Sequence, residues 1–221
     1  GIEPDEMAVR CNLICINPDG TIKNHSAGHI TTEEADELIG TLNTRLADGR
    51  FKIYTGVSYR HLLKIKDADK RISCTPPHDV PGAPAMDVMV KADVPEAEET
   101  ADYINSLILD SQEILRDHPV NLRRIAEGKD PANSIWPWSP GYKPSMETMM
   151  TLFGIKKGVV ISAVDLIRGI GVYAGLEPVI VPGATGLADT NYEGKVQAAI
   201  DALKGDADFV FLHIEASDEA G

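Results

Sequence analysis

The chain has 221 residues, of which 43% are hydrophobic and 25% charged, proportions typical of a globular protein with one large or two small domains. Its formal net charge is −13, from 34 acidic and 21 basic residues, which disfavours a nucleic-acid surface because such a surface needs a basic stripe. No apolar run is long enough to cross a bilayer, and the first residues carry no signal-peptide pattern. Three cysteines without metal-ligand or redox spacing suit a reducing cytosol, so we expect a cytoplasmic protein.

Strand and helix patterns alternate through the first half of the chain. Residues 6–16 alternate in polarity, which predicts a strand, and the NPDG turn at 17–20 predicts that the chain returns as a hairpin. Thr31 and Glu34 have the spacing of a capping box ahead of a helical repeat of apolar residues. Two β-rich stretches follow, and Pro95 is expected to open a long amphipathic helix. The pattern predicts an α/β domain.

Residues 116–145 depart from this regularity. They contain five prolines, both tryptophans and clustered basic residues. The segment is too aromatic for a flexible linker and too often broken by proline for a helix. We interpret it as an ordered loop that holds a ligand, with plain packing as the alternative.

From residue 157 the sequence becomes a regular β-α-β-α-β run. The stretches GVVISAV, EPVIV and DFVFLHI have the composition of buried strands, and amphipathic helices separate them. Such a run predicts a parallel sheet with right-handed crossovers. Because three parallel strands are few for a sheet buried on both faces, we expect this sheet to be incomplete.

Two short motifs carry side chains suited to an anionic ligand. In SYRHLL, Arg60 offers a planar fork that matches carboxylate or phosphate oxygens, and His61 adds a donor. In TPPHD, two prolines precede His78 and Asp79, so an imidazole and a carboxylate would be held in a rigid turn. An exposed edge charge, a satisfied histidine and a turn-capping aspartate are the alternative interpretations.

Three further stretches are more ambiguous. NLRRIAEGK places Arg124 in a basic cluster, which is either a solvated helix face or part of a ligand site. GATG at 183–186 lacks the dinucleotide fingerprint and the P-loop lysine, so a turn is favoured. The loop after the last strand offers donors for a divalent cation, although one short loop cannot complete the coordination shell. These donors are His213, Glu215, Asp218 and Glu219.

A series of stretches resembles the archaeal-type, cofactor-independent phosphoglycerate mutases of the alkaline phosphatase-like superfamily. They occur in order along nearly the whole chain, which makes the series more specific than any single motif. They are AVRCNLICI, HSAGHITTEEA, FKIYTGVSYRHLL, CTPPHDVPG, NSIWPWSPGYKP, KGVVISAVDLIRGIGVYAGL, GATGLADTNYEGK and FLHIEASDEAG.

The resemblance implies a fold and a reaction. The implied fold is α/β, with a substrate-binding insert domain over 1–157 and a partial metal-binding, phosphatase-like domain over 158–221 that keeps three parallel strands. The implied reaction interconverts 3-phosphoglycerate and 2-phosphoglycerate, in glycolysis and gluconeogenesis, through a phosphoserine. It uses two divalent metal ions, commonly manganese or magnesium and sometimes zinc. The implied partner is a small phosphorylated acid, with no nucleic acid or membrane.

Site residues follow from the same resemblance. Asp218 is implied as a metal ligand, and Lys195 as the catalytic lysine that balances phosphate charge, with a helix-surface lysine as its alternative. The implied contacts to glycerate or phosphate are Arg60, His61, His78, Asp79 and Arg124.

The resemblance also implies that the chain is an internal fragment. The family's nucleophilic serine and first metal-binding aspartate have no counterpart here, and the histidine four residues after Asp218 would be residue 222. We therefore expect the 221 residues to bind the acid without turning it over. The alternatives are another metal-dependent phosphohydrolase or phosphotransferase of the superfamily, or a non-catalytic module that binds a phosphorylated acid.

Overall fold

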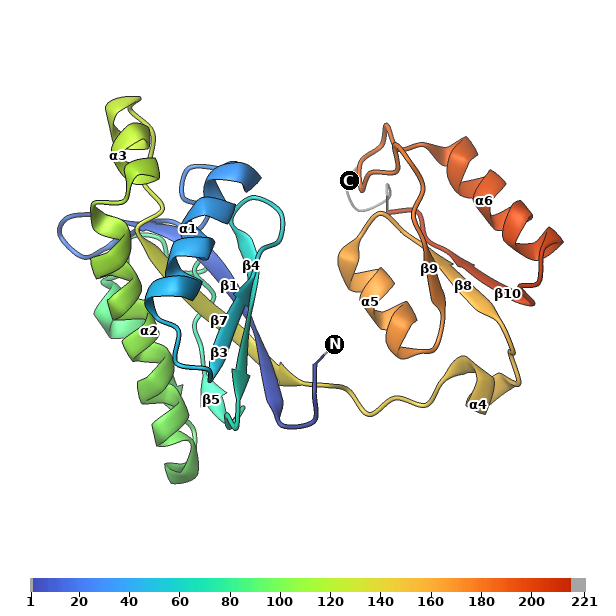
Figure 1. The fold of residues 1–221 in the computed structure, drawn as a ribbon, viewed down its shortest axis with the longest axis horizontal. Coiled ribbons are helices and arrows are strands. Elements are labelled where there is room, and N and C mark those ends of the chain that lie inside the picture. The colour runs from blue at the N-terminus through green and yellow to red at the C-terminus, as the bar shows by residue number, and fades with distance from the viewer. Residues whose placement is uncertain (1, 216–221) are drawn as a thin grey trace. The chain divides into compact units, whose positions relative to one another are not determined.

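The computed structural model describes residues 2–215 and divides into two compact units, Gly1–Lys143 (unit 1) and Pro144–Gly221 (unit 2) (Figure 1). Both units mix helices with β-sheet, as the predicted α/β class requires. The division comes earlier than the boundary predicted at 157/158. The reason is that the segment after Pro144 is bonded within unit 2: the Met149 amide donates to the Ala174 carbonyl at 2.8 Å. No helix in the described part has the length and apolar character to span a membrane.

Unit 1 is built on a five-stranded antiparallel sheet around one long central strand. The strand β1 (Glu6–Ile16) pairs with β4 (Arg60–Lys66) on one side and with β7 (Ser134–Tyr142) on the other. The short strand β2 (Ile22–Asn24) returns along the end of β1 and pairs Asn24 with Cys15, which confirms the predicted hairpin. The sheet ends at β3 (Phe51–Tyr54), which pairs with β4.

Two helices cover one face of this sheet (Figure 1). α1 (Thr32–Arg45) begins with the predicted capping box, in which Thr31 and Glu34 cap each other's backbone amides. α2 (Glu98–Arg116) follows a 3₁₀ turn at Pro95–Ala97, so the predicted amphipathic helix is also confirmed. The residues that these helices cover are fully buried, and on β1 they are Met7, Val9, Cys11 and Leu13.

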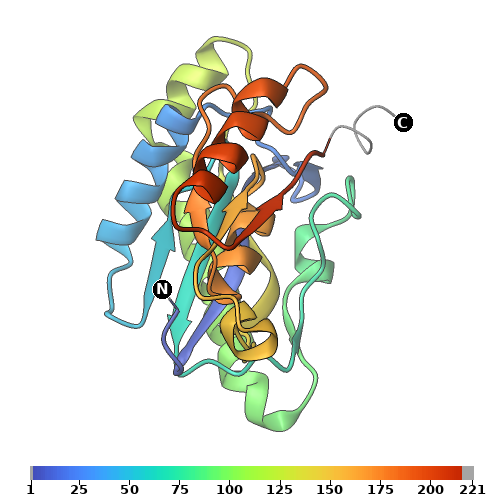
Figure 2. The ribbon, with the colours of Figure 1, turned by 90° about the vertical axis from the view of Figure 1, so that its right-hand side faces the viewer.

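The segment between β4 and α2 crosses to the other side of the sheet. It contains the two-stranded pair β5 (Ile72–Ser73) and β6 (Lys91–Ala92) and the 3₁₀ turn η1 (Ala85–Val88). In Figure 2 this segment, coloured teal to green, lies on the opposite side of the strands from α1. It is tied to the sheet by the Trp136 indole, which donates to the Thr75 carbonyl at 2.9 Å. The outer face of the sheet is therefore partly covered, and the rest of it is accessible.

The prediction of an ordered loop over 116–145 is wrong, because a helix and a strand occupy most of this segment. Pro119 occupies the first turn of α3 (Pro119–Ala126), where its missing N–H costs nothing, and the His118 side chain caps this helix. Both tryptophans, with Pro137 and Pro140, lie on β7, which pairs only with β1 among the described strands. An edge strand tolerates proline because one row of its amides has no strand to bond.

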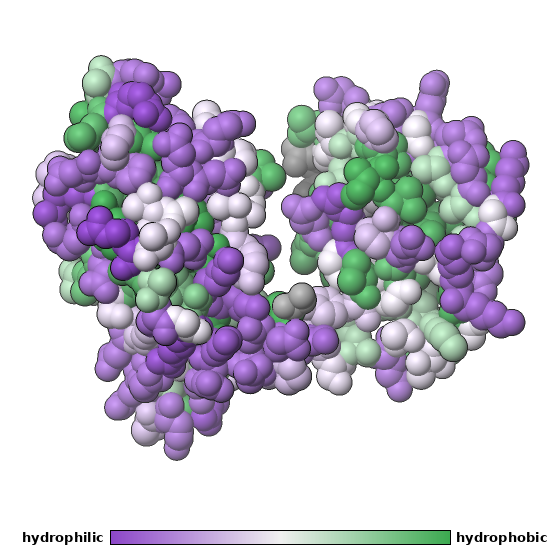
Figure 3. All heavy atoms as spheres, viewed as in Figure 1, coloured by the Kyte–Doolittle hydropathy of each residue, from purple (hydrophilic) through white to green (hydrophobic). Residues whose placement is uncertain are grey.

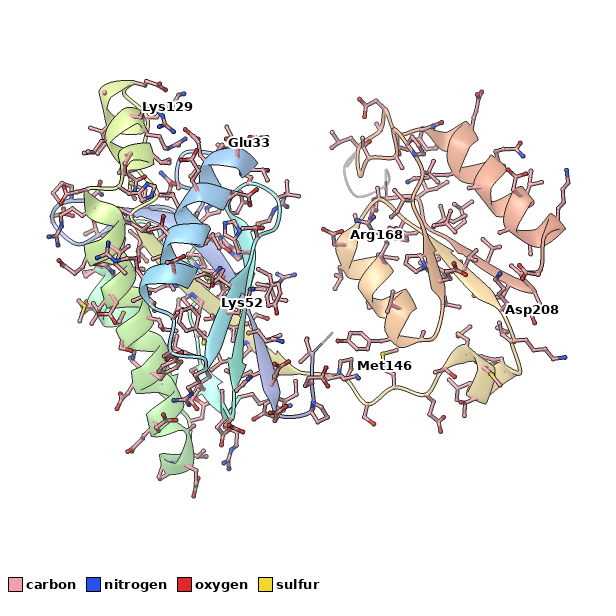
Figure 4. The ribbon with its side chains drawn as sticks, in the orientation of Figure 1. Glu33, Lys52, Lys129, Met146, Arg168 and Asp208 are labelled. Carbon is pink, nitrogen blue, oxygen red and sulfur yellow. The ribbon has the colours of Figure 1, made fainter. Side chains whose placement is uncertain are left out.

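Unit 2 contains a three-stranded parallel sheet in the order β10-β8-β9. The strands are β8 (Gly158–Ile161), β9 (Glu177–Val179) and β10 (Phe209–Leu212), and the helices are α4 (Met149–Phe153), α5 (Asp165–Tyr173) and α6 (Tyr192–Lys204). The predicted β-α-β-α-β run and its parallel pairing are confirmed. Asp208 lies at the start of β10 (Figure 4), where its carboxylate accepts the Lys156 and Lys157 amides at 3.0 Å.

Unit 2 exposes more of its apolar residues than unit 1. On α5, Leu166 is 60% exposed and Ile170 48%, and on α6 Leu203 is 55% exposed. Figure 3 shows the corresponding hydrophobic surface over this unit. The buried side chains of the parallel sheet itself are few, and they centre on Val159, Val160 and Ile161 of β8.

Candidate functional site

Four aromatic side chains meet on the outer face of the unit 1 sheet, and we call them the histidine cluster: His25, Tyr59, His78 and Trp138. The His25 ring packs edge-on against Tyr59 at 5.6 Å and against His78 at 6.0 Å between ring centroids. His78 packs in the same way on Trp138 at 5.2 Å. These residues come from four separate segments, so only the folded sheet brings them together.

One polar side chain of β1, that of Asn12, holds the cluster against the sheet. Asn12 donates its side-chain amide to the His25 carbonyl at 3.0 Å and accepts the Trp138 indole N–H at 3.0 Å. Asn12 is itself 4% exposed, so both bonds are shielded from water. The side chain thereby fixes two members of the cluster relative to β1.

Two exposed arginines flank the histidine cluster. The guanidinium of Arg10 lies over the Trp138 ring at 4.8 Å, and that of Arg60 lies 5.4 Å from the Tyr59 ring. Arg60 pairs with Asn12 across β1 and β4, which places both arginines on the outer face. Stacking on the rings orients the guanidinium groups and leaves their N–H groups available to an anion.

The same surroundings act on the charge of His25. Burial lowers the pKa of His25, and the neighbouring His78 and His29 lower it further. An anion bound between the arginines would act in the opposite direction, because it stabilises the imidazolium form. The cluster therefore combines the fixed positive charge of two arginines with His25, whose protonation responds to a bound anion.

The structure brings together three of the predicted contact residues. His78 belongs to the histidine cluster, and Arg60 flanks it. Asp79 follows His78 in the same turn, with its carboxylate 3.5 Å from the His78 Nε2. The Asp79 side chain is 59% exposed. Its position beside an imidazole suits a contact to a hydroxyl group rather than to a phosphate, because two anions repel each other.

His61 lies on the opposite face of the sheet from Arg60. Successive residues of a strand point to opposite faces, so the two cannot both face the cluster from β4. His61 is 7% exposed, accepts the Gly56 amide at Nδ1 at 3.3 Å, and has no hydrogen-bond partner at Nε2 among the described residues. Burial lowers its pKa to about 4. Its surroundings are those of a neutral core histidine.

Arg124 also lies away from the exposed surface. It is 2% exposed, and its guanidinium donates to three oxygens: the Asp130 carbonyl at 2.8 Å, the Glu34 carboxylate at 2.6 Å and the Ala27 carbonyl at 2.7 Å. An arginine engaged in this way is not free to grip a substrate directly. The predicted contact from Arg124 is thus disfavoured by its burial and its partners.

Sequence reasoning did not select five residues of this site: Arg10, Asn12, His25, Tyr59 and Trp138. Arg10 and Asn12 share the polar face of the predicted strand over 6–16, which was the one available signal. Their proximity to His25 and Trp138 depends on the pairing of β1 with β7, where Arg10 faces Trp138. A single sequence does not reveal that register.

A second group of polar side chains lies where β10 ends in unit 2. Lys195 of α6 is fully buried, and its ammonium donates to the His213 carbonyl at 3.4 Å. His213 Nδ1 and Glu215 Oε1 are 3.3 Å apart but not aligned as a hydrogen bond, so these buried atoms have no partner in the described part of the chain. The surface lysine considered for position 195 is not what the structure contains.

The residues of unit 2 fit a divalent cation only in part. An imidazole nitrogen and a carboxylate lie at the carboxyl edge of a parallel sheet, which is a common position for ligand sites. Nevertheless, no group of three or more histidine, cysteine or acidic side chains within residues 2–215 could hold a metal ion. Asp218, the predicted metal ligand, and Glu219 lie outside the described residues.

Comparison with known proteins identifies the family. Residues 1–121, more than half of the chain, match the family model of the 2,3-bisphosphoglycerate-independent phosphoglycerate mutases. The chain belongs to this family. The 2,3-bisphosphoglycerate-independent phosphoglycerate mutase of Methanosarcina acetivorans is 50% identical over 218 residues, which cover 98% of this chain and 53% of that protein.

Two solved structures have a similar fold, and one of them is a phosphoglycerate mutase. The cofactor-independent phosphoglycerate mutase of Thermoplasma acidophilum has a TM-score of 0.67 and 27% identity, over 96% of this chain and 56% of that one. A protein of Pyrococcus horikoshii has a TM-score of 0.74 at 23% identity, over 100% of this chain and 49% of that one, which supports the fold alone. The chain thus spans about half the length of the phosphoglycerate mutases it matches.

Proposed function

We propose that the chain is part of a metal-dependent phosphoglycerate mutase that interconverts 3-phosphoglycerate and 2-phosphoglycerate through a phosphoserine. In this proposal unit 1 is the substrate-binding insert domain and unit 2 is part of the phosphatase-like, metal-binding domain. Family membership supports the reaction. The histidine cluster with its flanking arginines is the single observation that supports substrate binding by unit 1.

Phosphoglycerate carries a phosphate, a carboxylate and a hydroxyl group on three carbons. Arg10 and Arg60 offer guanidinium forks to the two anionic groups, and His78 offers a further donor. Each charge-assisted hydrogen bond contributes on the order of 1.5–3 kcal/mol. Two arginines and a histidine would therefore give unit 1 weak to moderate affinity for the acid. His61 and Arg124 support the site from the core rather than contacting the ligand.

In unit 2 we assign His213 and Glu215 as donors at the edge of a metal site, and Asp218 as the metal ligand carried over from the family. Two divalent ions, manganese or magnesium, would supply the charge that steadies a transferring phosphoryl group. The described residues provide too few donors for a complete shell, so further ligands must come from elsewhere. Lys195 is assigned to hold positive charge beside this edge, because its ammonium is buried next to the end of β10.

Isothermal titration of the 221-residue chain with 3-phosphoglycerate tests the substrate-binding role. We expect binding, and we expect Arg10→Ala and Arg60→Ala each to weaken it by at least about tenfold, since one charge-assisted bond contributes about 1.5 kcal/mol or more. Lys52→Ala is a matched control. The substitution also removes one positive charge, but Lys52 lies on β3 near Tyr54 and not at the cluster. Equal binding by all three variants and the unmodified chain would remove the arginines from the site.

An enolase-coupled assay, with and without manganese, tests the reaction. It uses a longer protein that contains this chain and has the length of the phosphoglycerate mutases it matches. Mutase activity supports the proposal, and release of inorganic phosphate instead would favour a phosphohydrolase of the same superfamily. Binding without any turnover by that longer protein would favour a non-catalytic module. The 221-residue chain assayed alone is expected to bind the acid and to show no turnover.

A further inference from the structure

The buried Arg124 is bonded to a loop with unusual backbone angles, and this loop carries His25 of the histidine cluster. The loop runs from Asn24 to Ile30 and connects β2 to α1, and it carries His25. Three consecutive residues in it have left-handed backbone angles: Ala27 at φ 48°, Gly28 at φ 63° and His29 at φ 54°. Residues other than glycine adopt this conformation at a cost and keep it only where neighbouring groups enforce it.

Arg124 supplies one set of enforcing contacts. Its guanidinium donates to the carbonyl of Ala27, in the middle of the strained run, at 2.7 Å. It also donates to Glu34 at 2.6 Å, and the same Glu34 oxygen accepts the Thr31 amide in the capping box of α1. The arginine thus bonds both the loop and the helix terminus that the loop enters.

Asp130 supplies a second set of contacts. Its carboxylate accepts from Lys23 at 2.6 Å and from Asn24 at 2.5 Å, and its backbone carbonyl accepts from Arg124. The Asn24 side chain in turn accepts the Gly28 amide at 2.9 Å. A Cβ atom at Gly28 would lie 3.1 Å from the Asp130 Cβ, so the loop passes close to Asp130. We call Arg124 and Asp130 together the clamp.

A parallel connection reaches Tyr59, another member of the cluster. Ser58, also left-handed at φ 58°, donates its hydroxyl to the Ile30 carbonyl at 2.6 Å and its amide to Thr32 at 3.0 Å. Two of the four segments that contribute rings to the cluster, those of His25 and Tyr59, are therefore fastened at the start of α1. Figure 4 shows Glu33, beside Glu34, at that turn, and Lys129, beside Asp130, just beyond α3.

We propose that Arg124, with Asp130, is a positioning residue for the ligand site of unit 1: it acts through the 24–30 loop and sets where His25 stands against Tyr59 and His78. The inference rests on the proposed substrate-binding role of the cluster. It gives Arg124 a function that differs from the direct substrate contact expected from the sequence. Arginine is required because three acceptors in different directions need a planar fork, which a lysine ammonium does not provide.

The test compares Arg124→Lys and the milder Asp130→Asn with the unmodified chain. Asp130 has a 24% exposed side chain, so its replacement by an isosteric amide is expected to leave unit 1 folded. Arg123→Lys is the matched control, because Arg123 is the exposed neighbour of Arg124 on α3. The Trp136 indole N–H, bonded to Thr75 of the segment between β4 and α2, reports on the fold. The Trp138 indole N–H, bonded to Asn12, reports on the cluster.

Nuclear magnetic resonance gives a readout independent of substrate. In both clamp variants we expect the Trp138 indole signal to shift while the Trp136 signal stays, and the pKa of His25 to rise toward its ordinary value as the ring leaves its neighbours. Titration with 3-phosphoglycerate should show a dissociation constant raised about tenfold. Arg123→Lys should change none of these quantities.

Two results would count against the inference in different ways. Folded clamp variants with unchanged Trp138 and His25 signals would overturn the positioning role, whatever the affinity for the acid. If those signals move but the unmodified chain does not bind 3-phosphoglycerate at all, the loop is positioned as inferred and the proposed substrate-binding function fails. Should Arg124→Lys not fold, Asp130→Asn alone decides between these outcomes.

Discussion

The buried imidazole of His61 makes the stability of unit 1 depend on pH. Burial lowers its pKa to about 4, against an ordinary value of about 6.5. Between these two values the unfolded chain binds a proton that the folded chain excludes, so acidification favours unfolding. The stabilising contribution is complete above about pH 6.5 and is lost as the pH falls toward 4. From pH 7 to pH 5 the loss is roughly 2 kcal/mol, from 1.36 kcal/mol per pKa unit.

The perturbation that tests this is His61→Gln, which keeps an acceptor for the Gly56 amide and does not titrate. Urea unfolding at pH 7 and pH 5, followed by tryptophan fluorescence, reports on unit 1 because both tryptophans lie on β7. We expect the unmodified chain to lose roughly 2 kcal/mol more than the variant between these pH values. His29→Asn removes an exposed imidazole, in a residue type that tolerates the left-handed angle there, and serves as the control. Equal losses in His61→Gln and the unmodified chain would refute a buried neutral histidine.

Three further predictions concern separate features. Thr31→Ala removes the capping box of α1 and should lower the free energy of unfolding of unit 1 by about 1 kcal/mol in the same urea assay, whereas Thr44→Ala near the end of the helix should have a smaller effect. Gly171→Ala places a Cβ 2.6 Å from Val160 Cγ1 and should destabilise unit 2 by about 1–3 kcal/mol. Hydrogen exchange at the β8 amides measures this loss, and unchanged protection there would contradict the close packing of α5 on β8. Burial raises the pKa of Cys11 to about 12, so this thiol should react with a maleimide only after denaturation, and rapid labelling of the native chain at Cys11 would show that the strand opens.

Local signals explain why most elements could be predicted from the sequence. The capping box at Thr31 and Glu34 and the turn at 17–20 each depend on a few neighbouring residues, and each is present in the structure. The β-α-β-α-β run was readable because continuous apolar stretches are typical of parallel strands. The burial predicted for all three strands holds only for β8, since β9 and β10 are half-buried or exposed. The failure at 116–145 has a local cause as well: proline breaks a helix interior or a central strand, but it is tolerated at Pro119 in a first turn and at Pro137 on an edge strand.

The candidate site could be predicted only in part, because motif chemistry does not specify the face on which a side chain lies. Arg60 and His61 are neighbours in one motif, yet the period of a strand sends them to opposite faces, and only Arg60 reaches the histidine cluster. The role of Arg124 depends on contacts with residues nearly a hundred positions away, Ala27 and Glu34, and no local pattern reveals such contacts. A basic residue beside a ligand site can bind the ligand or hold the loop that does. Burial favours the second role for Arg124, which is 2% exposed and whose guanidinium is already bonded to two backbone carbonyls and the Glu34 carboxylate.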